Sequence, residues 1–150
     1  MKWVGEIFLF LTLFLYGQVA FADVIITEIM YDVSGTDTDR EWLEIYNAGE
    51  EGVDISKYKF FESSANHALS LFEGEAVLPK GGYAIIASNP TKFKTDWPAF
   101  TGVLFDSSFS LSNEGETLVI KDGNLEVTNE VTYDTSLGAG GDGRSLSKIN

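Results

Sequence analysis

The sequence predicts an all-β protein, folded as a β-sandwich of about eight or nine short strands. Runs rich in Val, Ile, Phe and Tyr recur at short intervals, and clusters of Gly, Asn, Asp and Ser separate them. A helical signal is confined to one short segment, 89–98, in which Asn89-Pro90 indicates a helix start and Pro98 a stop. With 150 residues, of which 44% are hydrophobic, the chain is long enough to bury a core between two half-buried sheets.

The expected strands follow one another between turn signals. The first is Val24 to Met30, a β-branched run that a polar loop containing Gly35 follows. The dense apolar run "YAIIAS", 83–88, indicates a central strand, and Gly123-Asn124 indicates a hairpin turn between two further strands. The other expected strands lie in 41–47, 53–62 with a turn at Ser56, 102–108, 116–122, 125–134 and 144–150.

The segment "EWLEIYN" is expected to place different side chains on its two faces, because successive side chains of a strand point in opposite directions. One face carries Glu41, Leu43 and Ile45, and the other carries Trp42, Glu44 and Tyr46. Leu43 and Ile45 are predicted to face the core. The second set would form an outer stripe that could stack on sugars or dock a partner, which makes its three residues the partner-binding candidates. The alternative is that a neighbouring loop covers the stripe.

The net charge of −13, from 23 acidic and 10 basic residues, restricts the class of partner. An acidic surface repels phosphate backbones, so the composition disfavours nucleic acid and favours cationic ligands or divalent cations. The chain has no cysteine, which excludes disulfides, thiolate metal sites and a lipoprotein anchor.

Residues 1–22 resemble an export signal, which would leave 23–150 as the mature domain. Lys2 provides a short positive start, 7–16 is an apolar run, and Ala20 to Ala22 is a small-x-small cleavage site. An uncleaved N-terminal anchor is the alternative, although the apolar run is short for a span of about 20 residues. If the signal is cleaved, no stable membrane span is expected, and the protein is secreted or displayed at the cell surface.

The acidic loop contains weak candidates for calcium ligands: Asp32, Asp37 and Asp39. Alternating acids can supply the six to eight oxygens that Ca²⁺ takes. An EF-hand is excluded, because its sixth and twelfth positions, counted from Asp37, hold Trp42 and Ala48 rather than Gly and Glu. A solvated polar loop is the alternative, and no other cofactor is indicated.

Acid pairs suitable for catalysis are not predicted. Glu41 and Glu44 lie three apart, so on a strand they point to opposite faces and could not flank one bond. Glu28 would approach Glu44 if the first two strands pair, but that is also an ordinary cross-strand arrangement. We therefore expect no catalytic residues and no enzymatic activity.

Two further features carry no predicted site. "GAGGDGRS", 138–145, imitates a phosphate-binding loop with Arg144 in the lysine position, but the following residues indicate a strand where such a loop needs a helix. His67 is the only histidine, which excludes a zinc site built from several histidines, and it is predicted to be a surface residue.

Several of these motifs together resemble the lamin tail domain family in its bacterial, exported form. "VIITEIMYD" and its acidic loop precede "EWLEIYN" and "VDIS", as in that family, and "LPKGGYAIIAS" resembles a later strand. "LSNEGETLVIKDGN" with "VTYD" resembles the family's hairpin and closing tyrosine, and "GDGRSLSKIN" its terminal strand. The segment "FFESSANH" departs from the pattern, since the family more often has a Trp-containing strand there. The resemblance spans roughly 24–150.

The resemblance implies an immunoglobulin-like β-sandwich without catalysis. It implies an exported or surface module for adhesion, envelope association or recruitment of a partner, either a protein or an envelope polysaccharide. Specificity is expected in loops 31–40, 63–68 and 89–102. The alternatives are an accessory domain of a larger exported hydrolase, a nuclease or phosphatase, which would continue past Asn150, and a calcium-dependent binding module.

Overall fold

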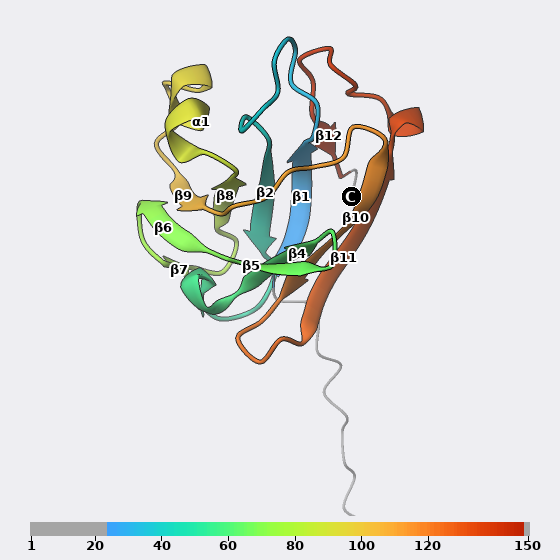
Figure 1. Ribbon diagram of the computed structural model, residues 1–150. Helices are drawn as coiled ribbons and strands as arrows, with labels where there is room; N and C mark the ends of the chain where they lie inside the picture. The colour runs from blue at the N-terminus through green and yellow to red at the C-terminus, as the bar shows by residue number, and fades with distance from the viewer. Residues whose placement is uncertain (1–23, 149–150) are drawn as a thin grey trace, which may run out of the picture.

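Two β-sheets packed face to face make up an immunoglobulin-like sandwich, for which the computed structural model describes residues 24–148 (Figure 1). The predicted export signal lies outside the described residues, and so do the last two residues of the expected final strand. Within residues 24–148, no helix is both long and apolar enough to cross a membrane.

The large sheet has six strands in the order β12-β1-β2-β8-β9-β6. Their bounds are β1 Val24–Met30, β2 Trp42–Asn47, β6 Ser70–Glu73, β8 Tyr83–Ala87, β9 Val103–Asp106 and β12 Leu146–Ser147. β8 is central, as its apolar composition predicts. β8 and β9 are parallel, whereas the other neighbouring pairs are antiparallel. A parallel neighbour needs a crossover connection, and the helix α1, Pro90–Asp96, supplies it.

The small sheet has four strands in the order β11-β10-β4-β5. Their bounds are β4 Lys59–Glu62, β5 Ala65–Ala68, β10 Gly115–Lys121 and β11 Val127–Asp134. The strands β10 and β11 form the predicted hairpin. A third, two-stranded sheet pairs β3, Val53–Asp54, with β7, Val77–Leu78. Two short 3₁₀ helices, η1 Ile55–Lys57 and η2 Thr135–Leu137, complete the described elements.

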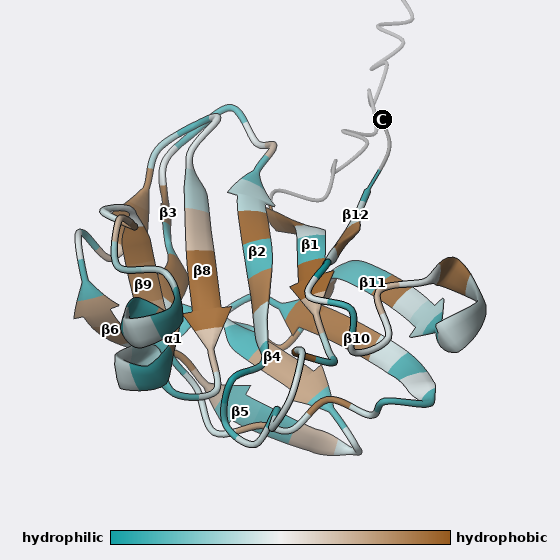
Figure 2. Cartoon of the chain, turned by 90° about the horizontal axis from the view of Figure 1, so that it is seen from above, coloured by the Kyte–Doolittle hydropathy of each residue, from teal (hydrophilic) through white to brown (hydrophobic). Residues whose placement is uncertain are grey.

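The main core lies between the two sheets, and Figure 2 shows apolar residues along the strands that face it. Leu43 and Ile45 are fully buried there, as the strand alternation predicts. They pack in one cluster with Phe60 of β4 and with Leu118 and Ile120 of β10. The amphipathic pattern of both sheets therefore stabilises the sandwich through the burial of apolar surface.

A second core lies on the outer face of the large sheet, under α1. It contains Met30, Trp42, Ile85, Ala87, Phe93 and Leu104. Because apolar side chains on both faces of the central strands are buried, these strands are apolar almost throughout, which explains the composition of β8. The short helix was predicted within 89–98, but the second core that it covers was not evident from the pattern of a simple sandwich.

The segment 63–68 is not the loop that the sequence suggested. Residues 65–68 form β5, which pairs antiparallel with β4, and only Ser63 and Ser64 make the turn. Both serines have positive φ, 44° and 66°, as a tight two-residue hairpin requires. The polar composition misled the prediction because β5 is an edge strand whose side chains are mostly exposed.

Candidate binding pocket

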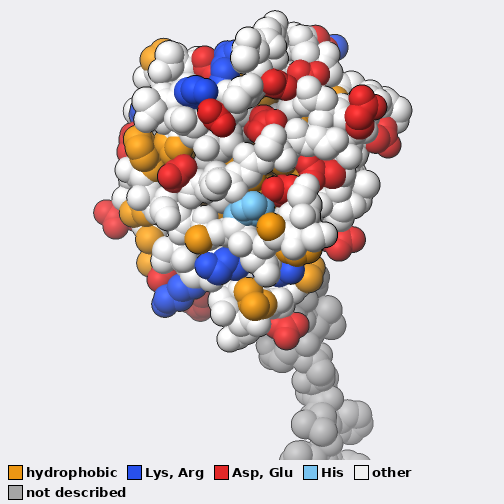
Figure 3. All heavy atoms as spheres, viewed as in Figure 1, with side chains coloured by type: hydrophobic (Ala, Val, Ile, Leu, Met, Phe, Trp, Pro, Cys, Tyr) orange, Lys and Arg blue, Asp and Glu red, His pale blue; other side chains and the backbone are white. Residues whose placement is uncertain are grey.

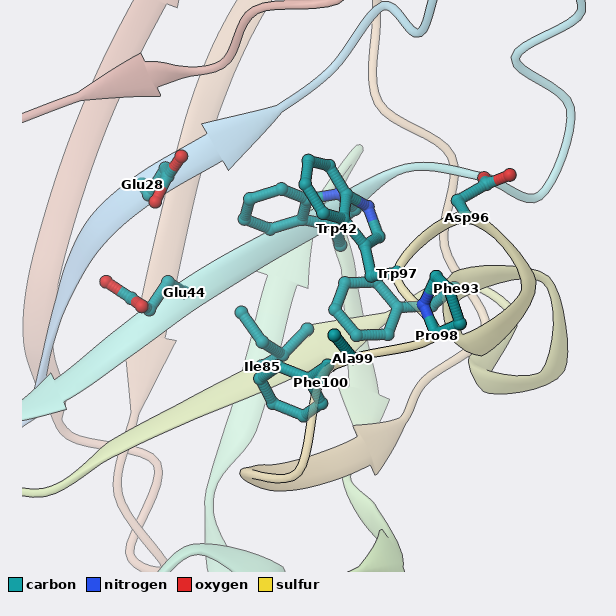
Figure 4. A pocket seen from close by; sticks show the side chains of 10 residues that line it. All are labelled: Glu28, Trp42, Glu44, Ile85, Phe93, Asp96, Trp97, Pro98, Ala99 and Phe100. Carbon is teal, nitrogen blue, oxygen red and sulfur yellow. The ribbon is translucent and has the colours of Figure 1, made fainter.

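A cavity of about 410 Å³ lies on the outer face of the large sheet, beside α1 (Figure 4). Four of its lining residues are aromatic: Trp42, Phe93, Trp97 and Phe100. Three are acidic: Glu28, Glu44 and Asp96. The others are Ile85, Pro98 and Ala99. A concave, mostly apolar surface with a few polar groups is the usual form of a ligand site.

Trp42 forms the floor of this pocket and does not belong to an exposed stripe. Its side chain is only 6% exposed, because α1 and the segment after it cover this end of β2. The alternation of faces along β2 is as predicted. Trp42 is covered, however, which was the alternative to an exposed stripe. Trp97 is 45% exposed and presents the accessible aromatic surface of the pocket.

The position at which the helix begins follows from its capping residues. The Asn89 side chain accepts a hydrogen bond from the backbone N–H of Lys92, and Pro90 occupies the first turn, where its missing N–H is not needed. Phe93, Trp97 and Phe100 then follow at intervals of four and three residues, which brings them to one side of the helix and its extension. That spacing is a signal for the pocket that can be found in the sequence.

Three pairs of aromatic rings in the pocket meet edge to face, and a fourth, Phe93 with Trp97, is tilted at 31°. The ring centroids of Trp42 and Trp97 are 6.0 Å apart at 87°, and those of Trp42 and Phe93 are 5.8 Å apart at 81°. Phe93 and Phe100 meet at 5.1 Å and 86°. Perpendicular rings turn faces in different directions, so the cavity is bounded by both ring faces and ring edges.

Polar contacts tie the covering helix to the rest of the domain. Nε of Arg40 lies 2.7 Å from Oδ2 of Asp96, and Nζ of Lys92 lies 2.9 Å from Oδ2 of Asp39. Nζ of Lys94 lies 2.9 Å from Oε2 of Glu73 in β6. Each exposed ion pair is worth little alone, but the three contacts lie at different points of α1. Together they connect the helix that covers the pocket to the loop of 31–40 and to β6.

Glu28 and Glu44 face each other across β1 and β2 at one end of the pocket. A β-bulge at Thr27 puts them there. Ile26 pairs with Ile45 on the core side, and after the bulge Glu28 pairs with Glu44 on the outer side. With strict alternation Glu28 would instead share the core face of Ile26. Bulges commonly redirect a side chain in this way.

Hydrogen bonds hold both glutamates. The hydroxyl of Thr27 donates to Oε1 of Glu44 at 2.8 Å, and that of Ser145 donates to Oε1 of Glu28. Within residues 24–148, neither glutamate forms an ion pair, whereas the third acid of the pocket, Asp96, is paired with Arg40. The uncompensated negative charge of the pocket therefore lies at its Glu28–Glu44 end.

Tyr46, the third partner-binding candidate, does not line the pocket. It lies at the other end of β2, half-buried, and its ring centroid is 4.7 Å from that of the exposed Tyr83. The three candidates therefore divide between two places: Trp42 and Glu44 at the pocket, and Tyr46 in a separate tyrosine pair. Because the pocket lies at only one end of β2, the outer residue at the other end of the strand, Tyr46, does not reach it.

The structure also places the three calcium-ligand candidates. Asp37 and Asp39 line a separate polar pocket with Glu41, and Asp32 is not part of its lining. Oδ2 of Asp37 accepts a hydrogen bond from the Asn113 side chain at 2.9 Å. Asp32 instead lies beside the glycine-rich loop that follows η2, in the group of loops at the top of Figure 1. Among the described residues, no group of three or more His, Cys, Asp or Glu could hold a metal ion.

A group of buried ionisable side chains lies near this polar pocket, and the sequence did not reveal it. Glu41 is 4% exposed, and burial raises its pKa from 4.5 to about 7, with the negative charges of Asp37, Glu116 and Asp39 adding to the effect. Burial likewise raises the pKa of Glu116, whose carboxylate accepts the hydroxyl of Tyr133 at 3.2 Å. Glu41, Glu116 and Tyr133 are far apart in the sequence and come together only when the two sheets pack.

His67 belongs to the same side of the molecule and is not a simple surface residue. Its Nε2 lies 3.0 Å from Oε1 of Glu62, whose side chain is 5% exposed. The imidazole also packs at 6.0 Å from the Phe60 ring. Figure 3 shows one edge of it, pale blue, beside acidic side chains. The sequence missed this role because it treated β5 as a loop.

The glycine-rich segment 138–145 does not have the structure of a phosphate-binding loop. It follows η2, and the strand β12 comes after it in place of a helix. Arg144, in the position of the lysine, is paired with Asp142. The prediction that the resemblance to such a loop is accidental agrees with this arrangement.

Comparison with known families agrees with the fold. The model of the Lamin Tail Domain family matches residues 18–135, which is most of the chain. No curated protein and no solved structure matches the chain significantly. The order of motifs, the sandwich and this match lead to the same conclusion: the chain belongs to the Lamin Tail Domain family.

Proposed function

We propose that this protein is a non-catalytic, exported binding module that recruits a partner protein at the cell envelope. The observation that carries the proposal is the aromatic pocket beside α1. Its floor is buried, Trp97 offers exposed aromatic surface, and its walls are tied to the sandwich by Arg40 and Lys92. A preformed pocket of this kind can take one projecting side chain of a partner with little loss of conformational entropy.

The arrangement of acids supports a binding role over catalysis. Glu28 and Glu44 lie side by side on neighbouring strands at the same end of the pocket (Figure 4). Glycosidases need two carboxyl groups on either side of one bond, so that one protonates the leaving oxygen while the other acts at the sugar carbon. Glu28 and Glu44 stand on neighbouring strands of one sheet, on one wall of the pocket rather than on opposite walls. The export signal expected in residues 1–22 supports a place of action outside the cytoplasm.

The binding test compares the purified protein with two single variants, using immobilised envelope proteins of the cells that make it. Trp97→Ala removes exposed aromatic surface from the pocket and should weaken binding about tenfold or more, as loss of a central aromatic anchor does. Tyr83→Ala removes an aromatic of similar exposure, 54% against 45%, outside the pocket and should leave binding unchanged. Equal affinities of all three proteins would refute the role of the pocket.

Export can be tested separately. If residues 1–22 are a cleaved signal, the protein recovered outside the cytoplasm should begin at Asp23, which mass spectrometry of the intact chain would show. Recovery of the whole chain in the cytoplasm would contradict export while leaving the pocket and its binding role unaffected.

A further inference from the structure

We propose that the aromatic pocket binds a lysine side chain of its partner, with the ammonium group between Glu28 and Glu44 and the hydrocarbon stem against Trp97 and Phe100. This inference rests on the proposed function, since it names the chemistry of the group that the pocket takes. The argument has three parts: an uncompensated pair of charges, the chemistry of the walls, and the place of the charges relative to the rings.

The Glu28–Glu44 pair is an unfavourable arrangement in the free protein. Like charges directly opposite on antiparallel strands are destabilising, because the two side chains are only about 5 Å apart at Cβ. Among the described residues, no Lys, Arg or His is paired with either glutamate. Lys148, next to the strand β12 that borders β1, is exposed and forms no such pair. A bound cation would remove this repulsion.

The hydrogen bonds of the two glutamates leave them able to accept more. Thr27 and Ser145 each donate one hydrogen bond to one carboxylate oxygen. An ionised carboxylate has about four acceptor positions, so each group keeps acceptor capacity for a ligand. An ammonium group is a compact charge with three rotatable donors and can contact both carboxylates at once.

The remaining walls suit an apolar stem that ends in a cation. Figure 4 shows the two glutamates at one end of the pocket, Asp96 at the other, and the aromatic rings between them. The positive charge of Arg40 already neutralises Asp96, so only the glutamate end attracts a cation. Aromatic rings next to that end can stabilise the cation further through their faces, while the stem replaces water on apolar surface. The net charge of −13 adds a long-range attraction for a basic partner.

The test uses small probes whose side chains differ only in the terminal group. N-acetyl-lysine methylamide and the norleucine equivalent are titrated into the ¹⁵N-labelled protein, and the indole N–H signals of Trp42 and Trp97 report the pocket. We expect the lysine probe to bind with a Kd of about 1 mM, which corresponds to about 4 kcal/mol. The norleucine probe should bind about tenfold more weakly, because it lacks the charge.

Matched variants separate the charge of the pocket from the charge of the whole protein. Glu28→Gln combined with Glu44→Gln should weaken lysine binding about tenfold and leave norleucine binding unchanged. Glu114→Gln combined with Glu126→Gln changes the net charge equally at exposed positions away from the pocket, and lysine binding should then stay close to that of the wild type. Each variant is first compared with the wild type by thermal melting, and the amide variants are expected to be at least as stable because they remove a repulsion.

The outcomes distinguish this inference from the function on which it rests. Equal binding of lysine and norleucine would overturn the charge assignment and leave a binding pocket for apolar groups. N-acetyl-arginine methylamide is titrated in the same way, and tighter binding of this probe than of the lysine probe would overturn the choice of an ammonium. A neutral oligosaccharide that shifts both tryptophans, when lysine does not, would overturn the inference and the choice of a protein partner. If no probe shifts either tryptophan, both the inference and the binding role of the pocket are refuted.

Discussion

Trp42 lies on its predicted face of β2 and is covered there, which was one of the two alternatives for that face. It lies on the outer face of β2, as alternation requires, but it packs against Phe93 and Trp97 and is almost fully buried. Exposure depends on what covers a side chain, and alternation gives no information on the covering. The same applies to Glu41, on the core face, where burial next to other acids could not be foreseen.

The buried position of Trp42 predicts a large cost of truncation. Trp42→Ala should lower the free energy of unfolding by about 3 to 5 kcal/mol, because it removes the centre of the second core and leaves a cavity. Trp97→Ala, in the half-exposed tryptophan of the same pocket, is the control and should cost clearly less. Urea unfolding of both variants gives the two values. Equal, small costs would show that Trp42 is not covered in solution.

Glu41 makes stability depend on pH. Its pKa is raised by burial from 4.5 to about 7, so its neutral form is favoured in the folded protein. Its contribution is fully present below about pH 4.5 and is lost as pH rises through about 7. At 1.36 kcal/mol per pKa unit, the loss is at most about 3 kcal/mol. The raised pKa of Glu116 acts in the same direction.

The measurement is the free energy of unfolding at several pH values between 4.5 and 8 for the wild type and Glu41→Gln. The amide cannot ionise, so the variant should lose much less stability over this range. Asp54 has a pKa lowered by its hydrogen bond from Ser56 and by Lys57, and its effect falls at lower pH, outside this window. Parallel curves for the wild type and the variant would contradict the assignment.

At the scale of elements, the sequence predicted most strands and the one helix. It did not predict the β-bulge in β1 or the edge strand β5. The hairpin of β10 and β11, the two parts of 53–62 and the helix start at Asn89 follow from local turn and capping chemistry, which a few neighbouring residues determine. The bulge at Thr27 and strand β5 could not be predicted in this way. A bulge depends on the register with a partner strand, and a polar edge strand depends on the neighbour that supplies its hydrogen bonds.

The start of β10 provides a sharp test of strand packing. Gly115 has φ +111°, and a Cβ there would lie 2.4 Å from the carbonyl oxygen of Tyr133 in β11. Gly115→Ala should therefore cost about 3 kcal/mol or more, since the backbone of the hairpin must move. Gly35→Ala is the matched control: φ is +87°, and no atom lies within 4 Å of the added Cβ. It should cost only about 1 to 2 kcal/mol, the cost of the left-handed conformation.

Thermal unfolding of the two glycine variants compares them directly. The difference between their melting temperatures reports the clash with β11, because both variants share the cost of positive φ. Similar melting temperatures would show that β10 and β11 are separated more widely at this end than the structure indicates.

At the scale of the whole molecule, charge is the dominant feature. A net charge of −13 on a small domain causes self-repulsion that salt screens. The melting temperature should therefore rise as NaCl is increased from low concentration to about 0.5 M. The Debye length is about 10 Å at 0.1 M and shorter at 0.5 M, so the added salt screens the repulsion. A melting temperature that falls with salt would indicate that attractive ion pairs, such as Arg40–Asp96, outweigh the repulsion.

The same melting experiment tests the calcium alternative. CaCl₂ is compared with NaCl at equal ionic strength, because a ligand specific to the folded state must raise stability beyond screening. An additional rise with Ca²⁺ that Asp37→Asn removes would support a site in the loop of Asp37 and Asp39. Identical curves would leave those residues with the hydrogen bond and ion pair that the structure shows.

The sequence by itself determined the fold class, the family and the facing of β2, because alternation and turn chemistry are local and repeat along the chain. Only the tertiary structure decided what covers the outer face of β2. The pocket needs the crossover of α1 onto the large sheet, the bulge that turns Glu28 toward Glu44, and the position of Trp97 above Trp42. Each of these depends on contacts between segments far apart in the chain, so the pattern of neighbouring residues does not predict them.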